Sequence, residues 1–249
     1  MQDYGGLEMV DCSETKHKAL ITIIDSDHKD NLEDIFIKYN MPINLLMYGQ
    51  GSAKSVIYDI LGYGGSKKII SISILARPML DFIMNQLYKK LHLNKPGTGI
   101  AFTVSLSTAT SMLLSVSKMA NENFKKGCED MTEIVSGTAK EPYHLIITIV
   151  NAGYFEKVME AAKSAGATGG TLVHARGLGS KEATKYLRIT VHPEKDVVLI
   201  LTPQEKKVKI MQSIAHEAGL NTPAMGTSFS IPVNSIMGFD TIFENEQEL

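Results

Sequence analysis

The feature that most constrains the fold of this chain is an internal repeat. The run Leu20-Ile21-Thr22-Ile23-Ile24 returns as Ile146-Ile147-Thr148-Ile149-Val150, with the two central threonines 126 residues apart. At the same spacing, Tyr48-Gly49-Gln50-Gly51 corresponds to His174-Ala175-Arg176-Gly177. The pattern N-x-P-x-x-G-x-x-F runs from Asn94 to Phe102 and again from Asn221 to Phe229, at a spacing of 127 residues. Three matches in one order predict two copies of one structural unit.

Both copies show the same order of apolar patterns. Short β-branched or alternating runs predict strands, and apolar residues at helical spacing predict helices. For copy one we expect strands at 20–24, 45–48, 69–75 and 100–106, with helices at 29–39 and 81–91. For copy two we expect strands at 145–150, 171–175, 185–192, 196–202 and 227–233, with helices at 154–165 and 206–218. Each copy then has the order βαββαβ, with 185–192 and 196–202 forming a hairpin, which is an α+β plan with an antiparallel sheet and both helices on one face.

These patterns predict the domain organisation. We expect copy one at 17–108, in a degenerate form, and copy two at 143–239. Residues 109–142 would form a linker, because 121–140 is polar, charged and rich in turn residues, although 111–119 has the pattern of a helix. The acidic residues 240–249 would form a frayed tail.

Composition excludes several classes of function. A net charge of −2 gives no electrostatic reason to expect nucleic acid or an anionic membrane as partner. The two cysteines, Cys12 and Cys128, lie far apart and fit a reducing compartment better than a disulfide framework. The polar N-terminus has no apolar signal core, and no run is long enough to span a bilayer. We therefore expect a cytoplasmic protein without membrane insertion.

A glycine-rich stretch from Gly166 to Gly179 distinguishes copy two. Two glycine clusters flank the predicted strand at 171–175, and Arg176 follows that strand. Because glycine accepts positive φ and lets another group approach the backbone, bare amides beside a cation predict a site for an anion or a nucleotide. A helix C-cap followed by a β-turn, with nothing bound, explains the same glycines. The spacing alone leaves both interpretations open.

With its βαββαβ order and its Gly-Ala-Thr-Gly-Gly-Thr segment, copy two resembles the PII family of nitrogen-regulatory signalling proteins over roughly 143–239. Copy one resembles that family more weakly, through the repeat. The resemblance implies a ferredoxin-like fold for each unit and a homo-oligomer, with a trimer favoured. It also implies adenine nucleotides bound in clefts between neighbouring subunits, and a mobile loop after the second strand that docks on partner proteins.

The resemblance assigns nucleotide-binding roles to three segments. The first would offer backbone and hydroxyl groups to the adenine and consists of Gly169, Gly170 and Thr171. The second lies at the base of the mobile loop, where amides meet phosphate, and consists of Arg176, Gly177, Leu178, Gly179 and Ser180. The third is a second phosphate loop before the last strand and consists of Met225, Gly226 and Thr227.

Two departures from the family pattern remove positive charge. The family commonly has an arginine where this chain has Ser180, and a lysine where it has Thr227. Lys181 or Arg176 could compensate, but fewer cations favour AMP or a cyclic nucleotide over ATP as ligand. In copy one the glycines give way to Ile43-Asn44-Leu45, whereas Gly51-Ser52 remains. Copy one is then a structural partner or binds a different ligand.

Other chemistry finds little support in the sequence. The seven histidines form no HxH or HExxH pattern, so no metal site is predicted, and His174 is expected to be a hydrogen-bonded structural residue. Neither a G-x-S-x-G elbow nor a phosphate-loop signature occurs, so no catalytic residue is predicted. We expect a non-enzymatic signalling protein that binds ATP, ADP, AMP or cyclic AMP and regulates a transporter or an enzyme through the loop at 181–195. The alternatives are a metal-handling protein or enzyme on the same fold, and a pure assembly module.

Overall fold

The computed structural model describes residues 9–11, 17–52, 66–95, 98–127, 142–176 and 194–238. The chain divides into two compact units. Unit 1 comprises residues 1–47, 69–140 and 233–249, and unit 2 comprises residues 48–68 and 141–232. Each unit therefore contains segments from both halves of the sequence: 48–68 belongs to copy one but lies in unit 2. The predicted linker segment 109–140 falls within unit 1.

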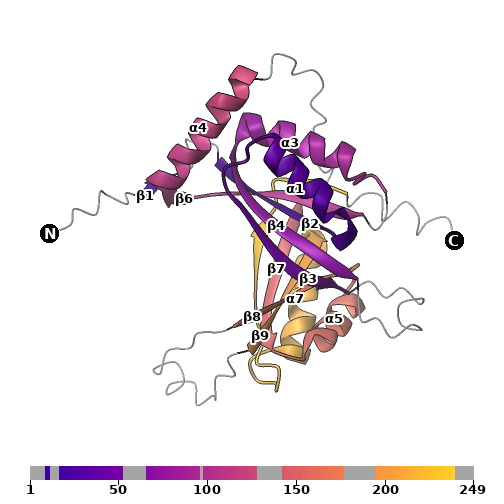
Figure 1. Cartoon of the computed structure of the whole chain (residues 1–249). Coiled ribbons are helices and arrows are strands. Elements are labelled where there is room, and N and C mark those ends of the chain that lie inside the picture. Colours follow the sequence, from indigo (N-terminus) through magenta and orange to yellow (C-terminus); the bar gives the residue numbers. More distant parts are fainter. Residues whose placement is uncertain are drawn as a thin grey trace. The chain divides into compact units, whose positions relative to one another are not determined.

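Unit 1 has an antiparallel sheet with helices packed against it (Figure 1). Its strands follow the spatial order β3-β4-β2-β5-β11, and β3 passes into unit 2 after Met47. The elements are β2 (His17–Asp25), the 3-10 turn η1 (Ser26–His28), α1 (Lys29–Lys38), β3 (Asn44–Gly51), β4 (Lys67–Ala76), α3 (Arg77–Lys90), β5 (Gly99–Ser105) and β11 (Ser235–Met237). A short ribbon of β1 (Met9–Asp11) and β6 (Thr108–Thr110) precedes α4 (Ser111–Gly127).

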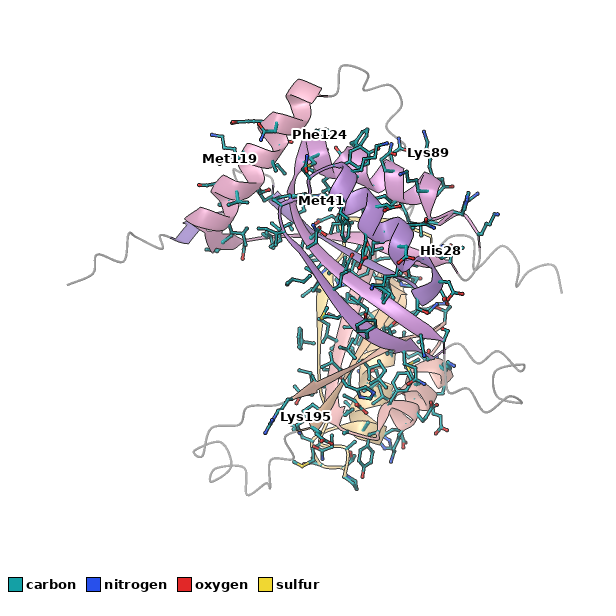
Figure 2. The ribbon with its side chains drawn as sticks, in the orientation of Figure 1. His28, Met41, Lys89, Met119, Phe124 and Lys195 are labelled. Carbon is teal, nitrogen blue, oxygen red and sulfur yellow. The ribbon has the colours of Figure 1, made fainter. Side chains whose placement is uncertain are left out.

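Helix α4 is longer than the sequence pattern predicted. The expected helix ended near Met119, but the observed one continues to Gly127. Phe124 explains the difference, because its ring is buried and lies 4.9 Å from that of Phe82, centroid to centroid. Figure 2 labels two residues of α4, Phe124 and Met119. Phe124 belongs to the unit 1 core, whereas Met119 is exposed. We infer that packing of Phe124 against the unit 1 core stabilises the polar second half of α4 as a helix.

Unit 2 repeats the βαββαβ order in copy two of the chain. Its strands follow the spatial order β10-β7-β9-β8, and the end of β3 pairs with β8 through Gln50 and Gly51. The elements are β7 (Tyr143–Asn151), α5 (Phe155–Ser164), β8 (Thr171–Arg176), β9 (Glu194–Pro203), α7 (Gln204–Ala218) and β10 (Thr227–Pro232). The expected strand at 185–192 lies outside the described residues.

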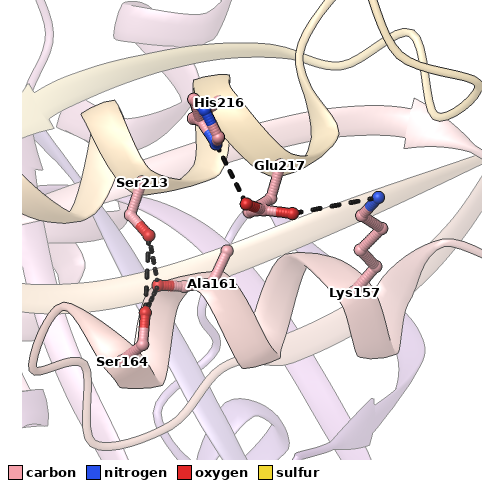
Figure 3. Close-up of polar contacts among 6 residues, drawn as sticks. All are labelled: Lys157, Ala161, Ser164, Ser213, His216 and Glu217. Carbon is pink, nitrogen blue, oxygen red and sulfur yellow. Dashed lines mark hydrogen bonds and ion pairs between the residues drawn. The ribbon is translucent and has the colours of Figure 1, made fainter.

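The two helices of unit 2 pack side by side through small and polar groups (Figure 3). Ser164 and Ser213 both donate a hydrogen bond of 2.8 Å to the carbonyl oxygen of Ala161. At the other end of the contact, the Lys157 ammonium lies 4.0 Å from the Glu217 carboxylate. Beneath the helices, Ile146, Val198, Ile200 and other buried apolar residues fill the core between α5, α7 and the sheet.

Strand register supports the duplication directly. In unit 1 Thr22 of β2 pairs with Ala101 of β5, and in unit 2 Thr148 of β7 pairs with Ser228 of β10. These partners are related by the sequence spacings of 126 and 127 residues. In both units the end of the first strand bonds to the segment before the last strand, but the acceptors differ by one position of the repeat. Asp25 N–H donates to Thr98 O at 3.1 Å, one residue before Gly99, and Asn151 N–H donates to Ala224 O at 2.8 Å, two residues before Gly226. The α+β class with antiparallel sheets and helices, predicted from the sequence, is confirmed.

The end of copy two departs from the simple plan. Residues 235–237, expected within copy two, form β11 and pair with β5 in unit 1. Ile236 and Met237 are buried there, which accounts for the pairing. A three-residue strand is too short to give a periodic signal, so the sequence did not predict it.

Candidate functional site

The structure describes seven of the eleven residues predicted to bind nucleotide. Gly169 and Gly170 lead into β8, which begins at Thr171 and ends at Arg176. Met225 and Gly226 end the turn before β10, and Thr227 is the first residue of β10. The other four predicted residues, Gly177, Leu178, Gly179 and Ser180, lie outside the described residues. Most of the loop predicted at 181–195 lies outside them too.

Gly170 is bonded to the chain itself. Ser52 N–H donates to Gly170 O at 2.8 Å, and Gly170 N–H donates to Ser52 Oγ at 2.7 Å. Lys163 Nζ adds a hydrogen bond of 3.2 Å to Ser52 O. A Cβ on Gly170 would lie 2.7 Å from Met159 Sδ, so close packing alone requires glycine there. The amide of Gly170 is thus engaged by Ser52, one of the two residues that copy one retained from the glycine motif.

Gly169 and Thr171, on either side of Gly170, have different surroundings. A Cβ on Gly169 would meet only Ser52 Oγ, at an ordinary contact distance of 3.6 Å. Thr171 is buried and pairs with both Leu199 and Gly51. The segment predicted to hold adenine therefore serves as the start of a paired strand.

The turn from Gly219 to Gly226 is fastened by a set of short hydrogen bonds. Gly226 N–H donates to Ala218 O at 2.8 Å, and a Cβ on Gly226 would overlap that oxygen. Thr222 Oγ1 donates to Gly219 O at 2.8 Å and accepts from Ala224 N–H at 3.2 Å. Met225 has φ of +50°, a left-handed conformation that is uncommon outside glycine. The turn thus has one defined shape, as a binding loop needs.

Asn151 at the end of β7 connects this turn to a cation that the sequence analysis did not select. Its Nδ2 donates to Pro223 O at 3.0 Å, and its Oδ1 accepts from Lys195 Nζ at 2.6 Å. Asn151 and Lys195 are direct partners in the β7–β9 register. The sequence analysis placed Lys195 at the end of the loop at 181–195, between two predicted strands, and no sequence spacing linked it to Asn151. Figure 2 labels Lys195, the second residue of β9.

His174 and Asp196 form a second polar pair at this end of the sheet. The Asp196 side chain is 2% exposed and lies with Oδ1 3.0 Å from His174 Nδ1, while its Oδ2 accepts from Gly153 N–H at 2.8 Å. The His174 ring is 76% exposed. The buried carboxylate thus holds the turn after β7 and orients the imidazole, as expected for a structural histidine. Among the described residues, no group of three or more His, Cys, Asp or Glu could hold a metal ion.

Beside the turn lies a hollow of about 390 Å³ between α7 and β10. It shares Gly226 with the predicted nucleotide site but is otherwise lined from the helix and the strand. Its lining residues are Val208, Met211, Gln212, Ile214, Ala215, Gly219, Gly226 and Ser228. This hollow is called the α7–β10 groove below.

Comparison with known proteins gives the class of this unit. Residues 143–241 match the family described as nitrogen regulatory protein P-II, and this match covers less than half of the 249 residues. Residues 143–241 are thus similar to the PII family, and copy one lies outside the matched range. No curated protein matches the chain.

Similar solved structures come from plants and bacteria. A PII protein of Arabidopsis thaliana bound to citrate shares 21% identity, with coverage of 38% of this chain and 79% of that one and a TM-score of 0.30. A GlnK–ATP complex of B. subtilis shares 14%, with coverage of 36% and 82% and a TM-score of 0.29. A PII-like signalling protein of Thermus thermophilus shares 19%, with coverage of 38% and 90% and a TM-score of 0.28.

No helix in the described part of the chain is long and apolar enough to cross a membrane. Within unit 2, three features lie at the end of the sheet where β7 ends, β8 ends and β9 begins. They are the turn from Gly219 to Gly226, the Lys195 ammonium and the exposed Arg176. The two cations can attract an anion to this end of the sheet, whereas the N–H groups of Ala224, Met225 and Gly226 are bonded within the turn.

Proposed function

We propose that the chain is a PII-like regulatory protein that binds a small adenine nucleotide through unit 2 and transmits its occupancy to a partner protein. The observation that carries this proposal is the match of residues 143–241 to the PII family. The geometry supports it with the Asn151-anchored turn and the adjacent Lys195. Because a lysine next to the turn replaces charge that Thr227 lacks, Lys195 is the residue we assign to the phosphate.

The proposal includes a ligand preference. With Ser180 and Thr227 in place of two cations, the site is suited to one phosphate better than to three, so AMP or cyclic AMP should bind at least as tightly as ATP. Calorimetric titration of the full chain with ATP, ADP, AMP and cyclic AMP measures this. A much tighter ATP complex would remove the preference but leave nucleotide binding intact, whereas binding of none of the four would overturn the function.

Lys195→Gln tests the phosphate role. Losing one charge-assisted hydrogen bond of 1.4 kcal/mol or more corresponds to roughly tenfold weaker binding of every phosphate-bearing ligand. Adenosine, which has no phosphate, should bind the variant and the parent equally. Lys209→Gln, at an exposed position of α7, is the matched control and should change neither affinity.

Signal transmission is proposed to run through the loop at 181–195. A nucleotide that contacts the loop base would favour one loop conformation, because a ligand shifts the population toward the state that it binds better. Limited trypsin digestion at Lys181, Lys185 and Arg188 should then slow when nucleotide is present. Unchanged cleavage under saturating ligand would contradict this part of the proposal. The proposed assembly is a homo-oligomer, with a trimer favoured, and the proposed compartment is the cytoplasm; light scattering on the purified protein tests the assembly.

A further inference from the structure

Ser52, which follows the last residue of β3, bonds to copy two through all of its polar groups. Its N–H donates to Gly170 O at 2.8 Å, and its Oγ accepts from Gly170 N–H at 2.7 Å. Its carbonyl oxygen accepts from Lys163 Nζ at 3.2 Å. Ser52 belongs to unit 2 and is buried there. Because Gly170 is one of the residues expected to offer main-chain groups to adenine, a residue of copy one occupies the groups that this ligand would use.

The main chain of Gly170 can be reached from one side. A Cβ on Gly170 would lie 2.7 Å from Met159 Sδ and 3.1 Å from Ile200 Cγ1, so the space on that side of the glycine is filled. The N–H and C=O of one strand residue point toward the same neighbour, and for Gly170 this neighbour is Ser52. A ligand that bonds to both groups therefore takes the place of Ser52. Neither residue lines the α7–β10 groove, so that hollow is not involved.

Ser52 presents to Gly170 the same pair of groups that adenine presents. The serine offers one donor, its N–H, and one acceptor, its Oγ. Adenine has an N6 amino donor beside a ring-nitrogen acceptor. The carbonyl and the N–H of Gly170 can bond to Ser52 or to the base, but not to both at once.

The pairing of β3 with β8 is short. In the described part of the chain its ladder consists of Gln50 with Leu172 and Gly51 with Thr171, whereas all six residues of β8 pair with β9. Tyr48, just before this ladder, is 73% exposed. Segments with few main-chain hydrogen bonds and few buried contacts open at a lower free-energy cost than the core does. The end of β3 can therefore separate from β8 while β8 stays paired with β9.

We propose that Ser52 competes with the adenine base for the main chain of Gly170, so that nucleotide binding to unit 2 releases the end of β3 from β8. The inference rests on the proposed function and adds a means of regulation, in which a residue of copy one is an internal competitor of the ligand. Because coupling between two binding events is reciprocal, whatever stabilises the Ser52–Gly170 bonds lowers the affinity for nucleotide.

Ser52→Ala tests the competition by removing the acceptor for Gly170 N–H. In calorimetry on the full chain, AMP and adenosine should both bind this variant about threefold or more tightly than the parent, because the competing hydrogen bond is lost. The factor should be the same for both ligands, since the competition concerns the base and not the phosphate. Ser66→Ala is the matched control: its hydroxyl lies beside Gly51 rather than Gly170, and both affinities should stay those of the parent.

A disulfide between positions 52 and 169 tests the closed state. A Cβ on Gly169 would lie 3.6 Å from Ser52 Oγ, so cysteines at both positions are close enough to bond. In a chain that also carries Cys12→Ser and Cys128→Ser, the oxidised Ser52→Cys, Gly169→Cys variant should bind AMP about tenfold or more weakly than the same variant after reduction. Each single cysteine variant should bind AMP equally with and without reductant.

Amide hydrogen exchange measures the release itself. Saturating AMP should speed exchange of the Ser52 N–H about tenfold or more, while Val198 in the core of unit 2 keeps its protection. If the parent binds AMP but Ser52 exchange, the Ser52→Ala affinity and the disulfide variant show no effect, this inference is overturned and the proposed function stands. If ATP, ADP, AMP and cyclic AMP bind neither the parent, nor Ser52→Ala, nor the reduced disulfide variant, both are overturned.

Discussion

At the scale of single residues, two adjacent glycines show how differently one residue type can be used. Gly170 exchanges two hydrogen bonds with Ser52, and a Cβ added to it would collide with Met159 Sδ, whereas a Cβ added to Gly169 would make only an ordinary contact with Ser52 Oγ. The sequence pointed to both positions as special but could not say why. The bond between Ser52 and Gly170 joins residues 118 positions apart, and no local pattern encodes it.

Gly170→Ala should destabilise the protein by about 1–3 kcal/mol, because the new methyl group forces Met159 and the β9 backbone to move. Gly169→Ala is the matched control and should change the free energy of unfolding by less than about 0.5 kcal/mol. Urea denaturation of both variants measures the difference. Equal effects would show that the contacts around Gly170 are not those described here.

Lys18 of β2 gives a pH-dependent prediction. Burial, reinforced by the nearby Arg77, lowers its pKa from the usual 10.5, while Asp81 opposes the shift. A lysine whose folded pKa is lowered destabilises the folded state at neutral pH, and this penalty fades as the pH rises toward 10.5. Lys18→Met should therefore unfold at higher urea concentration than the parent at pH 7. The gap should narrow as the pH rises toward 10.5, and the exposed Lys90→Met should show neither effect.

At the scale of elements, the spacing of apolar residues predicted the helices that have an apolar face. It did not predict segments whose structure depends on contacts with distant parts of the chain. Helices α1, α5 and α7 begin and end within a few residues of their predicted bounds, since each has an apolar face at helical spacing. The last turns of α4 and the short β11 were not predicted. Both depend on the burial of one or two apolar residues in unit 1. A polar or very short segment has no apolar periodicity from which this burial could be predicted.

Phe124→Ala should release the second half of α4. The ring packs against Phe82 and belongs to the unit 1 core, so its removal should cost about 3 kcal/mol. Hydrogen exchange in residues 120–127 should rise much more than in β2 or β5. Met119→Ala, at a side chain that is 63% exposed, is the control and should leave exchange as in the parent. Uniform protection in both variants would mean that Phe124 does not anchor the helix.

At the scale of the whole molecule, the two units share the register of their first and last strands, as the repeat in the sequence predicts. The duplicate turns differ in one residue that matters for charge. Asp25 precedes Asn151 by the repeat spacing of 126 residues and is its unit 1 counterpart. A carboxylate in that position opposes an anion, whereas the amide of Asn151 both fixes the turn and holds Lys195. The two positions thus differ in charge, and the described backbone near them differs as well, since Gly99 has φ of +145° in unit 1 and Met225 has φ of +50° in unit 2.

This difference predicts one bound nucleotide per chain, in unit 2. Asn151→Asp copies the residue of unit 1 into unit 2, removes the donor to Pro223 O and places a negative charge beside the phosphate. Nucleotide affinity should fall at least tenfold, while the far-ultraviolet circular dichroism of the variant stays that of the parent. Calorimetry that found two equivalents of nucleotide per chain, or an Asn151→Asp variant that bound as tightly as the parent, would show that charge at these turns does not decide which copy binds.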